Sequence, residues 1–303
     1  MNIPRWLLLA VIVPLLWGVW GALIEIPEKW VYPRFPPTLG YVVWSFTMVL
    51  LALVALRNIH WKFPFDLRSV LYGSAVGFSG AAGQLLLFWT LTKGPAYIIF
   101  PIICLSPVVT ILLSATLLRE RTHALATIGI GLSLLAIFFL SLQESGSSPV
   151  HGYAWLGLTI SIFFMWGLQA YFMKSSANSI SSEGLFFYMA VTAVLLCPIA
   201  LLMTDFSVPI NWGLSGFFLS GSLQLLNSIG ALLIIYAIRL GKAIIVVPMI
   251  NGLFPMVTIV LSLFIYHRVP NTYNFVGLFL ALVAIFMMAF DEVIHGTNPA
   301  KEG

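Results

Sequence analysis

The chain has 303 residues, of which 60% are hydrophobic and only 8% are charged, and its mean hydropathy is +1.03. A soluble domain carries about 25% charged residues, so this composition excludes a water-soluble globular enzyme. The formal net charge of +4 is better explained by membrane topology than by nucleic-acid binding, because the basic residues lie between apolar stretches.

Ten apolar stretches follow one another along the chain, and none contains Asp, Glu, Lys, Arg or His. Each is close to the ~20 residues that a helix needs to cross a bilayer, and continuous apolar runs do not fit the alternating strands of a membrane barrel. The first stretch is longer than a signal-peptide core and lacks an A-x-A-like cleavage site, so we predict a retained span. The predicted spans are 6–24, 39–56, 69–91, 95–118, 124–142, 152–173, 184–203, 212–238, 243–266 and 272–290.

The basic residues between the spans predict the orientation of the chain. The termini and the loops on their side of the membrane carry 10 Lys and Arg residues, whereas the loops on the opposite side carry 4. Because basic loops stay in the cytoplasm, we expect both termini to be cytoplasmic in a bacterial-type inner membrane. The short loops leave no room for a soluble domain.

The two halves of the chain repeat one pattern. The first half has Gly94-x-Ala96-x-x-x-x-Pro101, then Pro107-x-x-Thr110, and the second half has Gly241-x-Ala243-x-x-x-x-Pro248, then Pro255-x-x-Thr258. The offset between the copies is 147 residues as far as the first proline and 148 residues from the second proline onward. A duplicated membrane unit is typical of alternating-access transporters.

An odd number of spans in each copy sends the second copy into the membrane from the opposite side. We therefore predict an all-α membrane protein with ten transmembrane helices, arranged as two inverted five-helix repeats around a central cavity. The repeats are expected over 1–145 and 150–291, and a mobile cytoplasmic tail over 292–303.

The repeated motifs, together with Trp17-Gly18 and Trp166-Gly167 in spans one and six, resemble the ten-helix, EamA-type members of the drug/metabolite transporter superfamily. This resemblance implies a polytopic transporter in which helices 1, 3, 4, 6, 8 and 9 surround the cavity and helices 5 and 10 are peripheral. It also implies a substrate among amino acids, small metabolites, nucleotide sugars or drugs.

Polar and aromatic side chains within the apolar spans are the candidate substrate-binding residues. Amides in hydrocarbon either bind solute or join helices, and large aromatic rings either contact an apolar or cationic solute or pack against lipid. Both explanations stay open for each residue. The candidates are Trp17, Trp20, Gln84, Trp166, Gln169, Asn227 and Asn251.

Prolines and charges at matched positions give two further predictions. Pro101, Pro107, Pro248 and Pro255 free backbone carbonyls within spans, which favours interrupted helices near the site, although simple packing kinks are the alternative. Glu25 at the end of span one and Lys174 at the end of span six are candidate gates at opposite entrances, or ordinary interfacial charges.

The leading hypothesis is a secondary transporter that exports or exchanges a small amphipathic, zwitterionic or neutral metabolite, such as an amino acid or a drug-like compound. We expect no cofactor and no metal, because the five histidines lie outside the spans and do not cluster with cysteine. The expected partners are a small solute and the lipid bilayer, without nucleic acid, as a monomer or a homodimer.

The coupling of transport and three alternative functions stay open. No acidic residue lies within a predicted span, which disfavours proton coupling through a buried carboxylate and leaves facilitated diffusion, exchange, or coupling through Glu25. A nucleotide-sugar or phosphate-ester antiporter needs cations in its cavity, a lipid enzyme needs a catalytic group, and a passive channel needs only a pore.

Overall fold

The computed structural model describes every residue except 1–3, 94–98, 100–101, 143–153, 267–270 and 296–303. The described residues form helices, and the β-type pairing among them is an isolated bridge between Arg34 and Ile210. Eight helices of the described part are long and apolar enough to cross a membrane, and two shorter apolar helices, Ile102–Thr116 and Ala124–Leu140, coincide with the fourth and fifth predicted spans.

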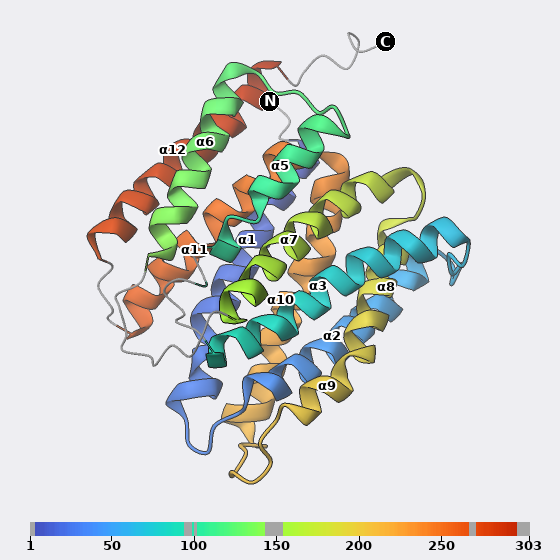
Figure 1. The fold of residues 1–303 in the computed structure, drawn as a ribbon, viewed down its shortest axis with the longest axis vertical. Helices are drawn as coiled ribbons and strands as arrows, with labels where there is room; N and C mark the ends of the chain where they lie inside the picture. The colour runs from blue at the N-terminus through green and yellow to red at the C-terminus, as the bar shows by residue number, and fades with distance from the viewer. Residues whose placement is uncertain (1–3, 94–98, 100–101, 143–153, 267–270, 296–303) are drawn as a thin grey trace.

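The helices, which Figure 1 labels, run in chain order. They are α1 (Arg5–Leu23), η1 (Ile26–Trp30), α2 (Pro37–Asn58), α3 (Leu67–Lys93), α5 (Pro107–Thr116), α6 (Ala124–Ser141), α7 (Ala154–Ser175), η2 (Ser176–Asn178), α8 (Ser182–Leu195), α9 (Cys197–Leu202), η3 (Leu214–Phe218), α10 (Leu219–Leu240), α11 (Ala243–Tyr266) and α12 (Thr272–His295).

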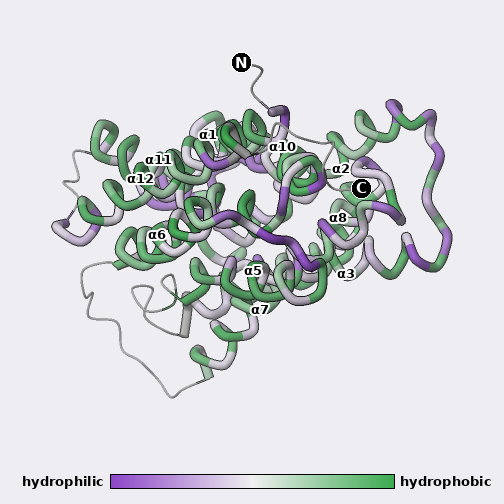
Figure 2. Tube along the Cα trace, turned by 90° about the horizontal axis from the view of Figure 1, so that it is seen from above, coloured by the Kyte–Doolittle hydropathy of each residue, from purple (hydrophilic) through white to green (hydrophobic). Residues whose placement is uncertain are grey.

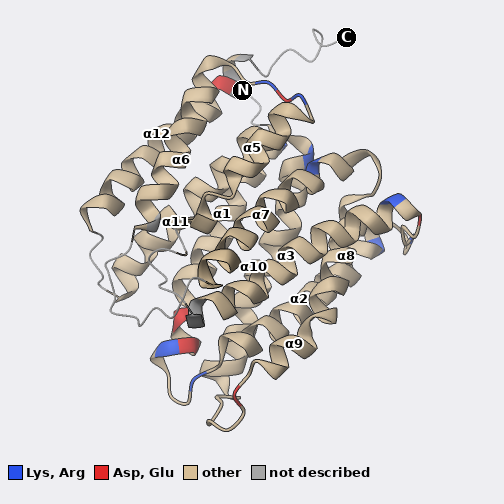
Figure 3. Cartoon of the chain, viewed as in Figure 1, with Lys and Arg blue, Asp and Glu red and all other residues tan. Residues whose placement is uncertain are grey.

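The distribution of polar groups explains why these segments are helical. A helix bonds all of its backbone groups internally, which a segment in lipid requires, and the spans offer few side chains that compete for those bonds. Figure 3 shows the charged residues at the two ends of the bundle, with an uncharged band between them. Figure 2 shows the same separation in hydropathy, because the helices are mainly hydrophobic and the hydrophilic segments are mainly connections.

Three helix boundaries differ from the sequence prediction. The first apolar helical segment continues through η1 to Trp30, so Glu28 belongs to it although the predicted span ends at residue 24. The α12 helix continues to His295, so the predicted mobile tail over 292–303 was wrong for its first four residues, and the rest of that tail lies outside the described part. The seventh span is divided at Leu196, since Pro198 cannot continue the helical hydrogen bonding.

The helices pack in two groups. The α6 and α12 helices lie side by side at one edge of the molecule (Figures 1 and 2) and contact each other extensively. In the main group, α1 packs against α10 and α11, α3 packs against α7 and α8, and α2 packs against α8 and α10. The largest buried cluster runs through this group, and it includes Val13, Leu185, Ile238 and Met249.

Matched residues of the two halves make matched contacts across the interface between the halves. Thr110 donates a hydrogen bond to the Gly167 carbonyl (2.9 Å), and Thr258 donates to the Gly18 carbonyl (3.4 Å). Gly18 and Gly167 leave no room for a side chain, because a Cβ there would lie 2.5 Å from the Cβ of Val257 and of Val109, respectively.

A second matched set of contacts involves two tryptophans. The Trp17 ring lies against Gly230, and the Trp166 ring lies against Gly83, 147 residues earlier than Gly230. At the molecular edge, Gly129 packs against Met288 and Gly277 packs against Leu140. Each half therefore makes the same contacts on the other half that the other half makes on it.

Candidate functional site

A cavity of about 220 Å³ lies in the main group of helices. Its lining comes from α1, α2, α3, α7, α8, α10 and α11, together with Ser106 just before α5. The described parts of α6 and α12 contribute no lining residue, as the resemblance implied for helices 5 and 10. The α2 and α8 helices add Trp44 and Met189, beyond the helices that the resemblance placed around the cavity.

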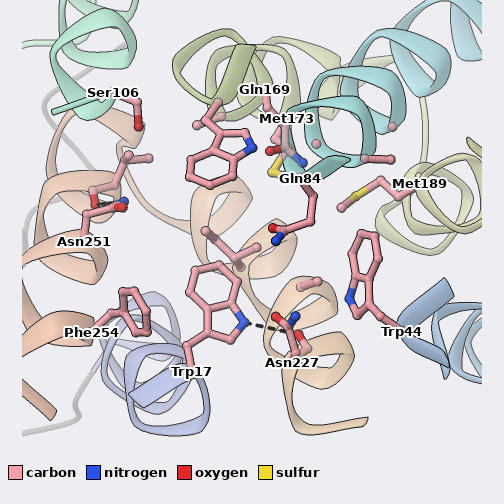
Figure 4. Close-up of a pocket in the computed structure, with 18 of the residues that line it drawn as sticks. Trp17, Trp44, Gln84, Ser106, Gln169, Met173, Met189, Asn227, Asn251 and Phe254 are labelled. Atoms are coloured by element: carbon pink, nitrogen blue, oxygen red, sulfur yellow. Dashed lines mark hydrogen bonds between the residues drawn. The ribbon is translucent and has the colours of Figure 1, made fainter. Parts of the chain in front are cut away.

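All seven residues predicted to bind substrate line this one cavity, and no comparison tests their role in binding. Figure 4 shows Trp17, Gln84, Asn227 and Asn251 converging on it from four helices. The remaining three also belong to the lining, which in full has Trp17, Trp20, Trp44, Gly77, Gly80, Ala81, Gln84, Ser106, Trp166, Gln169, Ala170, Met173, Met189, Asn227, Ala231, Ile234, Val247, Asn251 and Phe254.

Trp17 is fixed in the wall by contacts on two sides. Its indole N–H donates to the Asn227 carbonyl oxygen at 3.1 Å, which joins α1 to α10 (Figure 4). Its ring also meets Phe254 of α11 edge-on, with 6.3 Å between the ring centroids. Since Gly230 allows the close approach of the indole, this part of the wall is held without any charged group.

Two other indole N–H groups of the wall have no acceptor. The Nε1 atoms of Trp20 and Trp44 are buried, and neither has a hydrogen-bond partner among the residues that the structure describes. A buried donor without an acceptor costs about 1–3 kcal/mol. A solute with a suitably placed acceptor oxygen recovers that free energy, so these two groups favour a ligand with acceptors.

The amides of the wall differ in how far they are already bonded. Asn251 donates to the Val247 carbonyl (2.9 Å) and Asn227 donates to Gln224 Oε1 (3.4 Å). By contrast, no hydrogen bond joins the amide of Gln84 or Gln169 to another described side chain or backbone group. The side chain of Gln169 instead lies against Gly80 of α3. Two of the four amides are therefore available to a ligand without breaking an existing bond.

The lining contains no Asp, Glu, Lys, Arg or His. An isolated charge in such a site would be costly to bury, so the cavity suits a ligand that is neutral or balanced in charge. Four tryptophans and Phe254 supply flat apolar surfaces that suit a planar group.

The predicted helix interruptions differ from the structure in the second half. The α11 helix runs without a break through Pro248 and Pro255, although both lie within it. Ser133 of α6 donates to the Pro248 carbonyl (2.7 Å), which fixes the helix at this point. In the first half, α5 begins at Pro107 after a turn at Leu105 and Ser106. Pro101 lies outside the described residues.

The two candidate gates lie at opposite ends of the bundle. The Lys174 end is where α1 and α11 begin and α7 ends, and the Glu28 end is where α1 continues into η1 and α10 follows η3. Lys174 Nζ lies 3.6 Å from Glu120 Oε1 and also bonds the Gly241 carbonyl. Glu25 Oε1 lies 3.2 Å from Lys29 Nζ one helical turn later. The two gate residues therefore have separate partners.

Glu120 is a residue whose role was not recognised in the sequence. Its position between Arg119 and Arg121 favours a local ion pair, but its two carboxylate oxygens accept the N–H groups of Ala243 (3.1 Å) and Ile244 (3.0 Å). It thus caps the N-terminus of α11, where a negative charge is favourable. Only the three-dimensional contact between the α5–α6 connection and α11 reveals this function.

The comparisons with known proteins agree with this geometry. The sequence matches the EamA-like transporter family over residues 4–142 and again over residues 153–290. The chain belongs to the EamA-like transporter family. These two matches correspond to the two predicted repeats and place the protein among membrane transporters of the drug/metabolite transporter superfamily.

Two individual relatives add to this assignment. A protein of Methanocaldococcus jannaschii, described as uncharacterized, is 28% identical over 108 residues, which are 36% of this chain and 79% of the relative. A solved structure described as "Crystal structure of protein" superposes with a TM-score of 0.75 at 15% identity, covering 95% of this chain and 99% of the other. At that identity the second similarity shows the fold alone.

Proposed function

We propose that this EamA-family protein is a secondary transporter that works by alternating access and exports or exchanges a small neutral or zwitterionic solute with a planar apolar part. The observation that carries the proposal is the uncharged cavity of about 220 Å³, with its four tryptophans and four amides. The unpartnered N–H groups of Trp20 and Trp44 add the requirement for acceptor oxygens, such as those of a carboxylate within a zwitterion.

The proposal includes two inverted repeats of five spans. The matched contacts of Thr110 with Gly167 and of Thr258 with Gly18 support a two-fold relation between the halves, because such an axis exchanges partners in this way. With five spans per repeat, an axis that carries one repeat onto the other lies in the plane of the membrane. The excess of basic residues on the side of the termini supports cytoplasmic termini in an inner membrane.

In this orientation the Lys174 end faces the cytoplasm and is closed. Fully buried Val13, Ile238 and Val246 fill the bundle between the cavity and that end, and the contacts of Lys174 and Glu120 hold α7, the α5–α6 connection and α11 together. For a solute to enter from the cytoplasm, α11 must separate from α7. Lys174 and Glu120 therefore form the cytoplasmic gate in our proposal.

Counterflow into liposomes that contain the purified protein tests this function. Aromatic zwitterions should exchange saturably and compete with one another, whereas phosphorylated metabolites should not compete. Transport that never saturates, or discrete single-channel currents, would instead favour a channel. Preferential exchange of nucleotide sugars or phosphate esters would favour the antiporter alternative, which the absence of a cation in the lining opposes.

A further inference from the structure

At the Glu28 end of the bundle, three polar side chains from three segments converge on the backbone of α2. They are Glu28 of η1, Ser220 of α10 and Gln224 of α10 one turn later. Around the position that a Cβ of Gly40 would occupy, Gln224 Nε2 lies at 3.4 Å, Glu28 Oε1 at 3.8 Å and Ser220 Oγ at 3.8 Å. Because Gly40 has no side chain, these groups share a small space beside the helix.

Two members of this cluster are deeply buried. Ser220 is 1% exposed, and its hydroxyl has no hydrogen-bond partner among the described residues. Gln224 is 5% exposed, and its amide nitrogen faces the same space. A hydroxyl and an amide N–H are donors that can stabilise a carboxylate. The Glu28 carboxylate is the acceptor that the geometry offers them.

One hydrogen bond connects this cluster to the cavity. Gln224 Oε1 accepts from Asn227 Nδ2 (3.4 Å), and Asn227 lines the cavity and accepts the Trp17 indole N–H at its carbonyl. An amide that turns its N–H toward Glu28 presents its oxygen to Asn227. The charge on Glu28 therefore influences the orientation of an amide that the solute would meet.

The surroundings of Glu28 leave its carboxylate without a dedicated cation. On its own segment, Lys29 is paired with Glu25 (3.2 Å), and the side chain of Lys29 is 60% exposed. The η3 segment and the whole of α10 as far as Gln224 contain no ionisable residue. Tyr41 of α2 donates its hydroxyl to the Ala193 carbonyl (3.1 Å), and Tyr266 of α11 donates to Ala22 (2.7 Å).

We propose that Glu28, Ser220 and Gln224 form a proton-binding site that couples proton movement to the transport proposed above. The ionised carboxylate accepts hydrogen bonds from Ser220 and Gln224. Uptake of a proton from hydronium on the non-cytoplasmic side gives the neutral acid and water, and it releases these donors. The Gln224 amide is then free to reorient toward Asn227, which changes the hydrogen bonds offered in the cavity.

The site is tested first with protons alone, in the absence of any solute. The full-length protein in lipid nanodiscs is titrated from about pH 5 to about pH 9, and tryptophan fluorescence reports the environment of the indoles near Asn227. Infrared difference spectra report the C=O band of a protonated carboxylic acid. The wild-type protein should show one fluorescence step that coincides with this band.

Three variants decide the assignment. Glu28→Gln should abolish the step and the infrared band, and Asp205→Asn, which alters an exposed acid outside the cluster, should leave both unchanged. Ser220→Ala removes a donor to the charged form, so it should raise the midpoint by about one pH unit, the shift expected for losing one such hydrogen bond. Because Ser220→Ala keeps the carboxylate, it provides a second test if Glu28→Gln does not fold.

Three results would overturn the proposal: a step that persists in Glu28→Gln, a midpoint unchanged in Ser220→Ala, or a midpoint that moves with sodium concentration at constant ionic strength. The last result would assign the cluster to sodium. The titration also separates this inference from the proposed function, on which its coupling role rests. A normal titration without solute exchange would keep the proton site and refute the transporter, whereas saturable exchange without a titration would do the reverse.

Discussion

Lys174 Nζ lies 3.6 Å from Glu120 Oε1 while the same carboxylate caps the first N–H groups of α11. A single acidic side chain thus joins the end of one helix to the beginning of another. Loss of an N-terminal cap typically costs about 1 kcal/mol, so Glu120→Gln should lower the melting temperature of the purified protein measurably. Arg119→Gln, next to it, should have little effect, and equal losses in both variants would contradict the assignment.

The same pair predicts a change in access to the cavity. In Glu120→Gln the ion pair with Lys174 is lost, which favours separation of α7 from α11. A cysteine introduced at Ala170, in the cavity wall, should then react faster with a cytoplasmic thiol reagent than it does with Glu120 intact, after Cys104 and Cys197 are replaced by serine. Unchanged labelling rates would argue against a gate at this end.

The close approach of each tryptophan to a glycine predicts matched destabilisation. A Cβ at Gly83 would lie 2.5 Å from Trp166 Nε1, and a Cβ at Gly230 would lie 2.7 Å from Trp17 Cδ1. Overpacking of this kind costs roughly 1–3 kcal/mol, so Gly83→Ala and Gly230→Ala should both lower thermal stability. Gly157→Ala has open space around it and should be neutral or slightly stabilising.

The unpartnered indoles predict a specific loss of affinity. Trp20→Phe and Trp44→Phe remove a donor while keeping an aromatic ring, and each should weaken binding of an acceptor-bearing solute by about tenfold, the value of one good hydrogen bond. Trp155 also has a buried N–H without a described partner, but it lies outside the cavity lining. Trp155→Phe is therefore the matched control in a thermal-shift titration, and equal losses in all three would contradict the site.

The α3 helix begins at a titratable cap outside the membrane. Asp66 Oδ2 accepts the Ser69 N–H (3.1 Å), and the bonds from Ser69 hold the pKa of Asp66 below its usual value of 3.8. A depressed pKa stabilises the folded state above the unfolded-state pKa, and this contribution is lost as the pH falls through the folded-state pKa. Acidification should therefore destabilise the wild type slightly more than Asp66→Asn, which keeps the acceptor but does not titrate. Parallel melting curves would exclude this role.

The sequence predicted most of what depends on composition and repetition. Charge-free stretches of about 20 residues have one stable form in lipid, and they predicted the apolar helices. Polar and aromatic groups within those stretches predicted the cavity residues, because such groups need a non-lipid environment. Contacts between distant segments were not predictable in this way. The cap by Glu120, the exposure of Trp44 to the cavity and the burial of Glu28 each depend on which helices become neighbours.

Glu28 illustrates this limit. A carboxylate four residues beyond an apolar stretch is expected to lie in the headgroup region, and the sequence disfavoured proton coupling for that reason. The η1 segment continues the helical path, and Gly40 leaves space for the carboxylate beside α2. A small residue on a distant helix thus changed the interpretation of an acidic one.

The exchanged contacts of Thr110 and Thr258 also concern how such a chain arose. Gly18 and Gly167 each receive a hydroxyl from the opposite half, so one copy alone would expose the surface that its twin covers. An ancestral polypeptide with a single copy could bury that surface only as a pair, with its two molecules inserted in opposite directions. Fusion of the genes then fixed in one translation product an arrangement that had previously required two insertion events.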